Sequence, residues 1–106
     1  MPKSSLPRVH PGAILREDML PEIGMSVTAA ARALWVSRQM LHDILAERRP
    51  LSAAMCLRIA KLFGSSPEMW MCLQATYDLR NAREDKKVQA SVERIMPIAN
   101  VEDAVA

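Results

Sequence analysis

The sequence predicts an all-α protein with five helices in one domain. Apolar residues recur three and four positions apart along most of the 106 residues, which is the spacing of one helix face. Serine precedes several of these apolar runs, in the position that caps the first turn of a helix. Only three glycines are present and aromatic residues make up 4% of the chain, which speaks against β-sandwiches, propellers and Gly-rich nucleotide loops.

The first predicted helix follows an N-terminal arm. Residues 1–9 contain proline and serine without periodicity, and we expect them to be flexible. Pro11 suits a first helical position because the N–H that it lacks would be unpaired there. The inner face of this helix continues through Ile14, Leu15 and Met19. We expect Pro21 and Gly24 to end it.

The second and third predicted helices are short. Ser26 or Thr28 caps the second, which is rich in alanine and therefore lets another helix approach closely. The third is expected to run from its cap at Ser37 to Glu47. Its inner apolar stripe consists of Leu41, Ile44 and Leu45. Its outward face carries Arg38, Gln39, His42 and Asp43.

Two longer helices follow. Ser52 caps the fourth helix after Pro50, and Gly64 ends it in the position where a left-handed residue is favoured. Ser66 and Pro67 then start the fifth helix, which is expected to fade near residues 84–87. The inner residues are Met55, Ile59, Leu62 and Phe63 in the fourth helix, and Trp70, Leu73, Gln74 and Tyr77 in the fifth.

The C-terminal part of the chain is ambiguous. We place the domain at residues 10–87 and a C-terminal extension at residues 88–106. Apolar residues at helical spacing in this extension are Val88, Val92 and Ile95. Residues 92–97 fit a short strand equally well. We expect the extension to provide a dimer contact and its end to be frayed.

Charge and cysteine content narrow the class of protein. Residues 1–64 contain nine Lys and Arg against five Asp and Glu, whereas residues 65–106 contain five against seven. A basic first part suits a polyanion partner. We interpret Cys56 and Cys72 as core thiols in a reducing compartment, because two cysteines are too few for a disulfide framework. With no secretory signal or membrane span recognisable, we expect a cytoplasmic protein without membrane contact.

Residues 27–44 carry the pattern with the clearest functional meaning. A short helix, a turn of about three residues and a second helix with outward polar groups are typical of a helix-turn-helix unit. Ala31 is small enough for the place where the two helices cross. The apolar anchors of this unit are Leu34, Val36, Leu41 and Ile44. Such a unit predicts a second helix that enters the major groove of DNA.

The outward side chains of that second helix match the edges of DNA bases. Arg38 fits the O6 and N7 acceptors of guanine, and Gln39 fits the N6 and N7 edge of adenine. His42 is suited to donate to a base or a phosphate, and Asp43 to accept from a cytosine amino group. The same face also fits an ordinary solvated helix surface, so the sequence leaves both interpretations open.

Five further residues are predicted to contact backbone phosphates. Arg48 and Arg49 follow the second helix and supply positive charge, with ordinary loop charges as the alternative. Ser26, Thr28 and Ser37 lie at helix starts, where hydroxyl and N–H groups donate to phosphate. No catalytic set, metal-ligand spacing or cofactor loop is recognisable, so we expect no enzyme, no metal site and no cofactor.

Three stretches of the chain resemble one family. They read VHPGAILREDML, TAAARALWVSRQMLHDILAERRPLSAAMCLRIAKLFG and SSPEMWMCLQATYDLRNA. They are similar to the HigA/VapI branch of the Xre-type helix-turn-helix antitoxins, and the W-x-x-L-Q-x-x-Y-D-L run at residues 70–79 separates this branch from other Xre repressors. The resemblance implies a lambda-repressor-like dimer of five-helix domains that binds an operator in its own promoter. It also implies a partner toxin, usually a RelE-like mRNA endonuclease.

Trp35 departs from the family pattern. The turn position that it occupies is usually glycine, because the chain there often has a positive φ. A tryptophan in that conformation costs on the order of 1 kcal/mol or more. We therefore expect either an adjusted turn or an indole whose packing offsets the strain.

We accordingly predict a homodimeric repressor and antitoxin. Its two recognition helices would enter successive major grooves of a palindromic operator, and another surface would neutralise a small toxin. Trp70 and Tyr77 are interpreted as core and dimer packing, with Tyr77, Leu79 and residues 92–98 as an alternative partner surface. Two other functions stay open: a stand-alone Xre-type transcriptional regulator without a toxin, and a protein-interaction module that has lost DNA binding.

Overall fold

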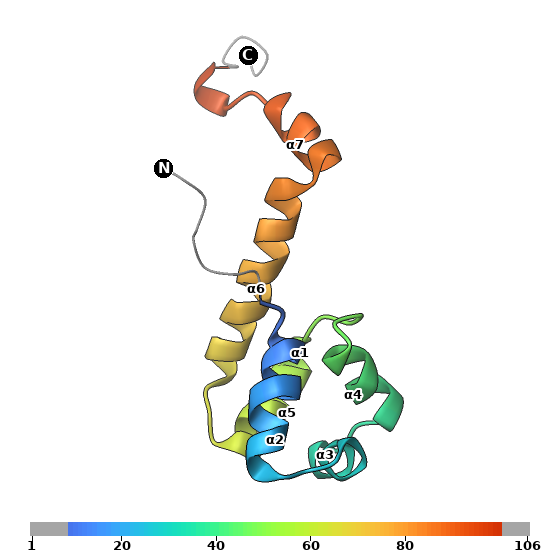
Figure 1. Ribbon diagram of the computed structural model, residues 1–106. Coiled ribbons are helices and arrows are strands. Elements are labelled where there is room, and N and C mark those ends of the chain that lie inside the picture. Colours follow the sequence, from blue (N-terminus) through green and yellow to red (C-terminus); the bar gives the residue numbers. More distant parts are fainter. Residues whose placement is uncertain (1–8, 101–106) are drawn as a thin grey trace.

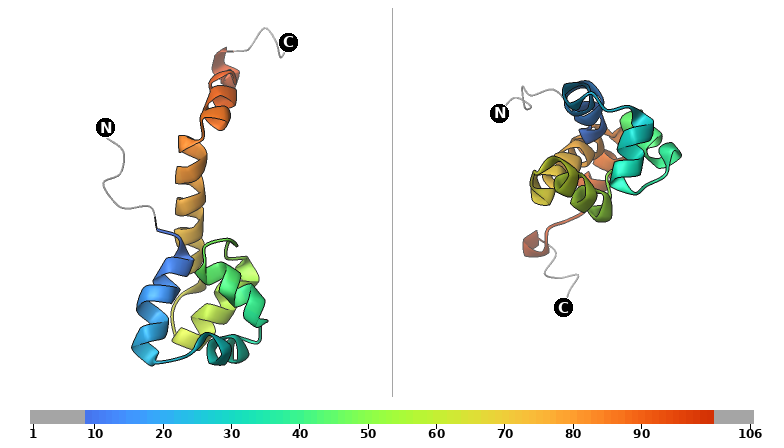
Figure 2. Two further views of the ribbon diagram at one scale, coloured as in Figure 1. Left: turned by 45° about the vertical axis from the view of Figure 1, so that its right-hand side comes forward. Right: turned by 90° about the horizontal axis from the view of Figure 1, so that it is seen from below.

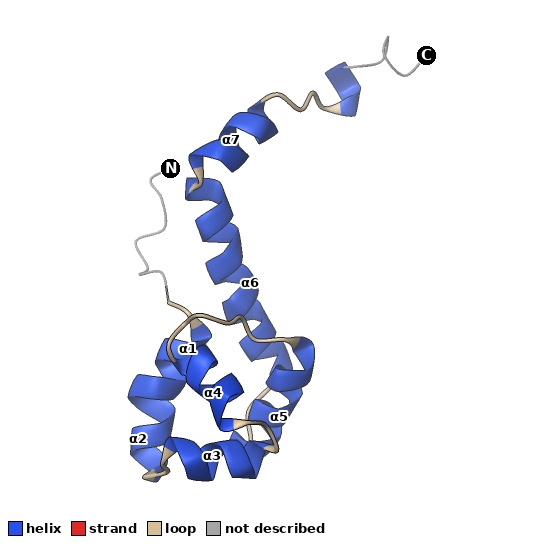
Figure 3. Cartoon of the chain, turned by 90° about the vertical axis from the view of Figure 1, so that its right-hand side faces the viewer, coloured by secondary structure: helices blue, strands red, loops and turns tan. Residues whose placement is uncertain are grey.

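The computed structural model describes residues 9–100, and every regular element in that range is helical (Figures 1 and 3). In chain order the elements are α1 (Pro11–Ile14), η1 (Leu15–Met19), α2 (Leu20–Ile23), α3 (Val27–Leu34), α4 (Arg38–Leu45), α5 (Ala53–Phe63), α6 (Pro67–Glu84), α7 (Lys86–Glu93) and η2 (Ile98–Asn100). The expected all-α fold is confirmed for these residues. The predicted arm, apart from Val9, and the predicted frayed end after residue 100 lie outside them.

The first predicted helix is one rod made of α1, η1 and α2 (Figure 1). Its middle, η1, is a π-helical turn, which is wider than a regular α-helical turn. The expectation that Pro21 ends the helix is wrong, because Pro21 lies in the first turn of α2. The wide turn directly before it accommodates a ring that would collide with a carbonyl in a regular helix. The rod ends at Gly24, whose φ is 68°.

Serine caps α3, α4, α5 and α6 as predicted. Each Oγ accepts a hydrogen bond from a backbone N–H three residues further on: Ser26 from Ala29 (3.1 Å), Ser37 from Met40 (3.0 Å), Ser52 from Met55 (3.1 Å) and Ser66 from Met69 (3.2 Å). Of the two candidates for α3, Ser26 is therefore the cap, and Thr28 lies inside the helix. The cap of α1 was not apparent in the sequence: His10 Nδ1 accepts from the N–H of Gly12 at 2.8 Å.

The core lies between the rod, α3, α4, α5 and the first part of α6. Its buried apolar side chains include Leu15, Leu34, Leu41, Ile44, Leu51, Met55, Ile59 and Trp70. Trp70 is 1% exposed, and its indole Nε1 donates to Ser65 Oγ at 2.9 Å. The interpretation of Trp70 as a core residue is confirmed.

The two cysteines differ in their surroundings. Cys56 is buried in the core, and this burial raises the pKa of its thiol. Cys72 is exposed, so its interpretation as a core thiol is wrong. The reason is the rotation of α6: Trp70 faces the core, and a residue two positions further on lies about 200° around the helix.

α6 and α7 project from this body as an arm (Figures 1 and 2). Asp85 caps α7, because its carboxylate accepts from the N–H groups of Lys87 (2.9 Å) and Val88 (3.3 Å). The first part of the extension is therefore a helix, and residues 92–97 form its end and a loop, not a strand. No residue of α7 is buried. Exposed apolar side chains along the arm are Leu79, Val88, Val92, Ile95, Met96 and Ile98.

Over residues 9–100, none of the helices combines the length and the apolar composition that crossing a bilayer requires.

Candidate nucleic-acid interface

α3 and α4 pack together through small and apolar residues. Ala31 is 2% exposed, so this small residue of α3 is buried, and α3 packs against α4. Leu34, Leu41 and Ile44 are buried in the shared core, and Val36 packs against it from the turn. The predicted anchors of the helix-turn-helix unit are thus confirmed. They hold one face of α4 inside and leave the other face exposed.

The turn between α3 and α4 keeps a left-handed residue. Trp35 has a φ of 61°, and its N–H donates to the carbonyl of Arg32 at 3.2 Å. The N–H of Val36 donates to the carbonyl of Ala31 at 3.0 Å, which completes a Schellman motif. The indole is 85% exposed. Both alternatives expected for Trp35 are therefore wrong: the turn is not adjusted, and no packing offsets the strain.

Side-chain hydrogen bonds from Arg58 to the backbone stabilise this turn, whereas packing of the indole does not. Nη1 of Arg58, on α5, donates to the carbonyl of Leu34 at 2.9 Å and to that of Trp35 at 3.3 Å. A guanidinium at the C-terminal end of α3 also lies at the negative pole of that helix. The turn is therefore fixed by its main chain, and the tryptophan side chain is not needed for its geometry.

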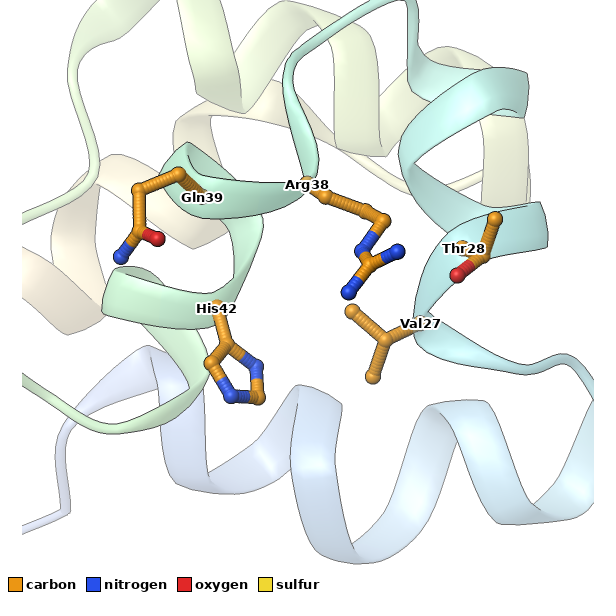
Figure 4. Close-up of a pocket in the computed structure, with 5 residues that line it drawn as sticks. All are labelled: Val27, Thr28, Arg38, Gln39 and His42. Atoms are coloured by element: carbon orange, nitrogen blue, oxygen red, sulfur yellow. The ribbon is translucent and has the colours of Figure 1, made fainter.

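The exposed face of α4 and the start of α3 surround one shallow hollow (Figure 4). It has a volume of about 160 Å³ and is lined by Val27, Thr28, Arg38, Gln39 and His42. Three of the four predicted base-reading residues and one predicted phosphate-contacting residue therefore lie together. The guanidinium of Arg38 points across the hollow toward α3 (Figure 4). The arrangement presents hydrogen-bond donors and acceptors to the outside from a rigid helix pair.

Asp43 lies beside this hollow and connects several of the polar residues. Its Oδ1 accepts from Gln39 Nε2 at 3.0 Å and from Arg48 Nη2 at 2.9 Å. Its Oδ2 is 4.0 Å from Arg49 Nη2. The hydrogen bond from Arg48 lowers the pKa of Asp43, and the bond from Gln39 adds to that effect. Asp43 thus stays ionised and holds the side chains of its neighbours.

The predicted phosphate-contacting residues lie at both ends of α4 and at the start of α3. Ser26 and Ser37 are exposed and use Oγ to accept from the backbone, which leaves each hydroxyl hydrogen available to an acceptor. Arg48 and Arg49 follow α4, and their side chains are 60% and 49% exposed. The structure therefore surrounds the exposed face of α4 with donors.

The rod supports α4 at its C-terminal end, and the sequence carried no signal for this contact. Arg16 Nη1 donates to the carbonyl of Leu45, the last residue of α4, at 2.6 Å. Gly12 lies so close to α4 that an added Cβ would be 1.9 Å from the carbonyl oxygen of Ile44. These contacts join residues about thirty positions apart, where periodicity and capping patterns give no information.

The geometry defines a helix-turn-helix protein of the nucleic-acid-binding class. Residues 15–70 match a protein-family model that is described as helix-turn-helix. The chain is 38% identical to Virulence-associated protein I of Dichelobacter nodosus over 92% of this chain and 87% of that protein. The chain belongs to the Xre helix-turn-helix family, in the branch of the HigA/VapI-type antitoxins. This is a family of regulators and antitoxins, not of enzymes.

Solved structures of similar proteins have the same fold. The antitoxin HigA of Pseudomonas aeruginosa, solved with the higBA promoter, is 39% identical with a TM-score of 0.78, over 87% of this chain and 99% of that chain. The antitoxin GraA, solved in complex with its operator, is 36% identical with a TM-score of 0.78, over 92% and 97%. Both similarities extend beyond the helix-turn-helix unit into the later helices.

Proposed function

We propose that this protein is a DNA-binding antitoxin that represses its own operon and neutralises a RelE-like mRNA endonuclease. The observation that carries DNA binding is the exposed polar face of α4, held by a buried apolar face and set beside the start of α3. Two relatives with the same fold were solved on promoter or operator DNA, which supports the same use of α4 here.

The roles of the residues follow from their positions. Arg38 and Gln39 reach the floor of the major groove and bond guanine and adenine, while His42 donates to a base or a phosphate. Asp43 uses Oδ1 to hold Gln39 and Arg48, which leaves Oδ2 for a cytosine amino group. Backbone phosphates are contacted by Ser26, Thr28, Ser37, Arg48 and Arg49.

A homodimer would present two copies of α4 to successive major grooves about one helical turn apart. The apolar side chains of α7 support this proposal, because they are exposed in the single chain and form no core of their own. We place the dimer contact in this arm, and a palindromic operator follows from the two-fold symmetry of such a dimer. Toxin neutralisation is supported by the family alone, because HigA antitoxins carry that function in their name.

Binding to the DNA upstream of the protein's own gene tests the proposal. Arg38→Ala and Gln39→Ala should each lose about 1–3 kcal/mol of binding free energy and relax specificity at one base pair. Lys61→Ala on α5 is the matched control, since its exposed cation lies outside both the proposed DNA-binding face and the proposed dimer contact, and it should bind like the natural protein. If neither Arg38→Ala nor Gln39→Ala changes the retention of promoter DNA at low salt, a protein-interaction module becomes the better account.

The toxin is tested separately from DNA binding. Co-expression with the adjacent small gene should restore growth and give a co-purifying complex. A protein that binds its operator but neither rescues growth nor co-purifies would be a stand-alone transcriptional regulator.

A further inference from the structure

The two turns that flank α4 contain residues other than glycine in a left-handed backbone conformation. Among the described residues, four have a positive φ close to that of a left-handed helix: Gly24, Trp35, Glu47 and Gly64. The two glycines end α2 and α5, whereas the two larger residues flank α4 on either side. Strained backbone of this kind is found preferentially at functional sites. Glu47, directly before Arg48, is the residue whose side chain has a specific partner.

The backbone at Glu47 closes the last turn of α4. The N–H of Glu47 donates to the carbonyl of Ile44 at 3.0 Å, and the N–H of Arg48 donates to the carbonyl of Asp43 at 2.8 Å. This pair of bonds is a Schellman motif, which normally has glycine in the position of Glu47. The carbonyl of Leu45, the last residue of α4, is the acceptor that Arg16 contacts.

Arg16, which lies on the rod, contacts both the backbone at the end of α4 and the side chain of Glu47. Its Nη1 donates to the Leu45 carbonyl at 2.6 Å and to Glu47 Oε2 at 3.1 Å. A cation at this place is favoured by the negative end of the helix, and a charged donor strengthens each hydrogen bond. The carboxylate of Glu47 is therefore held by the same atom that satisfies the end of α4.

The backbone of the rod adds a second point of contact. Gly12, one turn before Arg16, touches the carbonyl of Ile44 so closely that a Cβ at this position would overlap with it. The helical turn of α4 that ends at Glu47 is thus fixed by a guanidinium and by direct backbone contact. Arg48 leaves from this turn, and its guanidinium reaches back to Asp43 at 2.9 Å.

We propose that Arg16 and Glu47 are a positioning pair that fixes the C-terminal end of the recognition helix and thereby directs Arg48 at an operator phosphate. This inference rests on the proposed function, because it concerns how DNA is bound. Arg16 itself does not contact DNA. It acts through the conformation of Glu47, and its loss releases the segment from which Arg48 extends.

Operator binding at several salt concentrations tests the pair. Arg16→Gln should weaken binding by roughly 5- to 10-fold, an effect of the size common between coupled neighbours. It should also reduce the slope of log affinity against log salt by about one unit per subunit, as Arg48→Ala does. The double variant should bind no more weakly than Arg48→Ala alone. Glu22→Gln is the control: Glu22 is an exposed carboxylate on α2 of the same rod, outside the pair, and its variant should leave affinity and salt slope unchanged.

The outcomes separate the pair from the proposed function. Additive losses in the double variant, or a salt slope that Arg16→Gln leaves unchanged, would overturn the pair while operator binding by the natural protein stands. No operator binding by the natural protein would overturn both. If Arg16→Gln does not fold, Arg16→Lys keeps the charge but lacks the planar fork, and it must show the same coupling to Arg48.

Discussion

The two ends of α4 use the same backbone conformation but treat the side chain in opposite ways. Trp35 before the helix has a φ of 61°, and Glu47 after it has a φ of 63°. The indole of Trp35 is 85% exposed, whereas the carboxylate of Glu47 pairs with Arg16 at 3.1 Å. At both ends two backbone hydrogen bonds form a Schellman motif.

The difference shows that hydrogen bonding and the neighbouring helices set these turns, and that the residue type does not. At the Trp35 end, Arg58 holds two backbone carbonyls and leaves the side chain without a structural role. At the Glu47 end, the side chain is part of the contact with the rod. Substitution at the first end should therefore act only through the left-handed φ, whereas substitution at the second end also removes a contact with the rod.

The largest expected effect is at the close contact of the Glu47 end. Gly12→Ala places a methyl group where the Ile44 carbonyl lies, so the rod or the last turn of α4 must move. We expect the free energy of unfolding to fall by about 2–3 kcal/mol, as for overpacked cores, and urea unfolding measures it.

Gly24→Ala is the control for this substitution. It meets no atom within 4 Å and has only the cost of its φ of +68°, about 1 kcal/mol. Equal losses in the two variants would show that the contact between the rod and α4 is loose.

An intermediate effect should distinguish the two left-handed residues directly. Trp35→Gly should raise the free energy of unfolding by about 1 kcal/mol, because glycine adopts this φ without strain and the exposed indole buries little surface. Glu47→Gly should gain less, since it also loses an exposed ion pair worth about 0–1 kcal/mol. Thermal unfolding of the two variants side by side checks this order, and a larger gain for Glu47→Gly would contradict it.

The smallest expected effect is a pH dependence at the same end of α4. His10 is 3% exposed, its ring stacks edge-on against Tyr77 at 4.9 Å, and burial lowers its pKa. Glu47 and Asp78 act in the opposite direction and limit the shift. The unfolded chain therefore takes up a proton near its ordinary pKa of about 6.5, before the folded protein does.

The contribution of neutral His10 to the free energy of unfolding should thus be fully present above this pH. It should decrease as the pH drops from 7 toward 5. Unfolding measured across that range checks the slope. His10→Asn keeps an acceptor that caps α1 and removes the titrating ring, so it should flatten the dependence. An unchanged slope in this variant would place the titration at another residue.

Local patterns predicted most of the fold and of the candidate site. The four serine caps and the apolar anchors of α3 and α4 were predictable, because each depends on residues three or four positions apart. The outward position of Arg38, Gln39 and His42 followed from the same periodicity. Two features were not predictable. Pro21 lies within the helix and does not end it, because a π-helical turn precedes it. Cys72 is exposed because of the rotation of α6.

Up to residue 84, the sequence by itself determined which segments are helical, where they begin, and which face of α4 stays outside. These properties come from interactions within one or two turns, which the order of residues displays directly. Only the tertiary structure decided how α4 is held: Arg16 meets the carbonyl of Leu45 across 29 positions of the chain. Such a contact depends on how separate helices pack in three dimensions, because neither residue carries a local preference for the other.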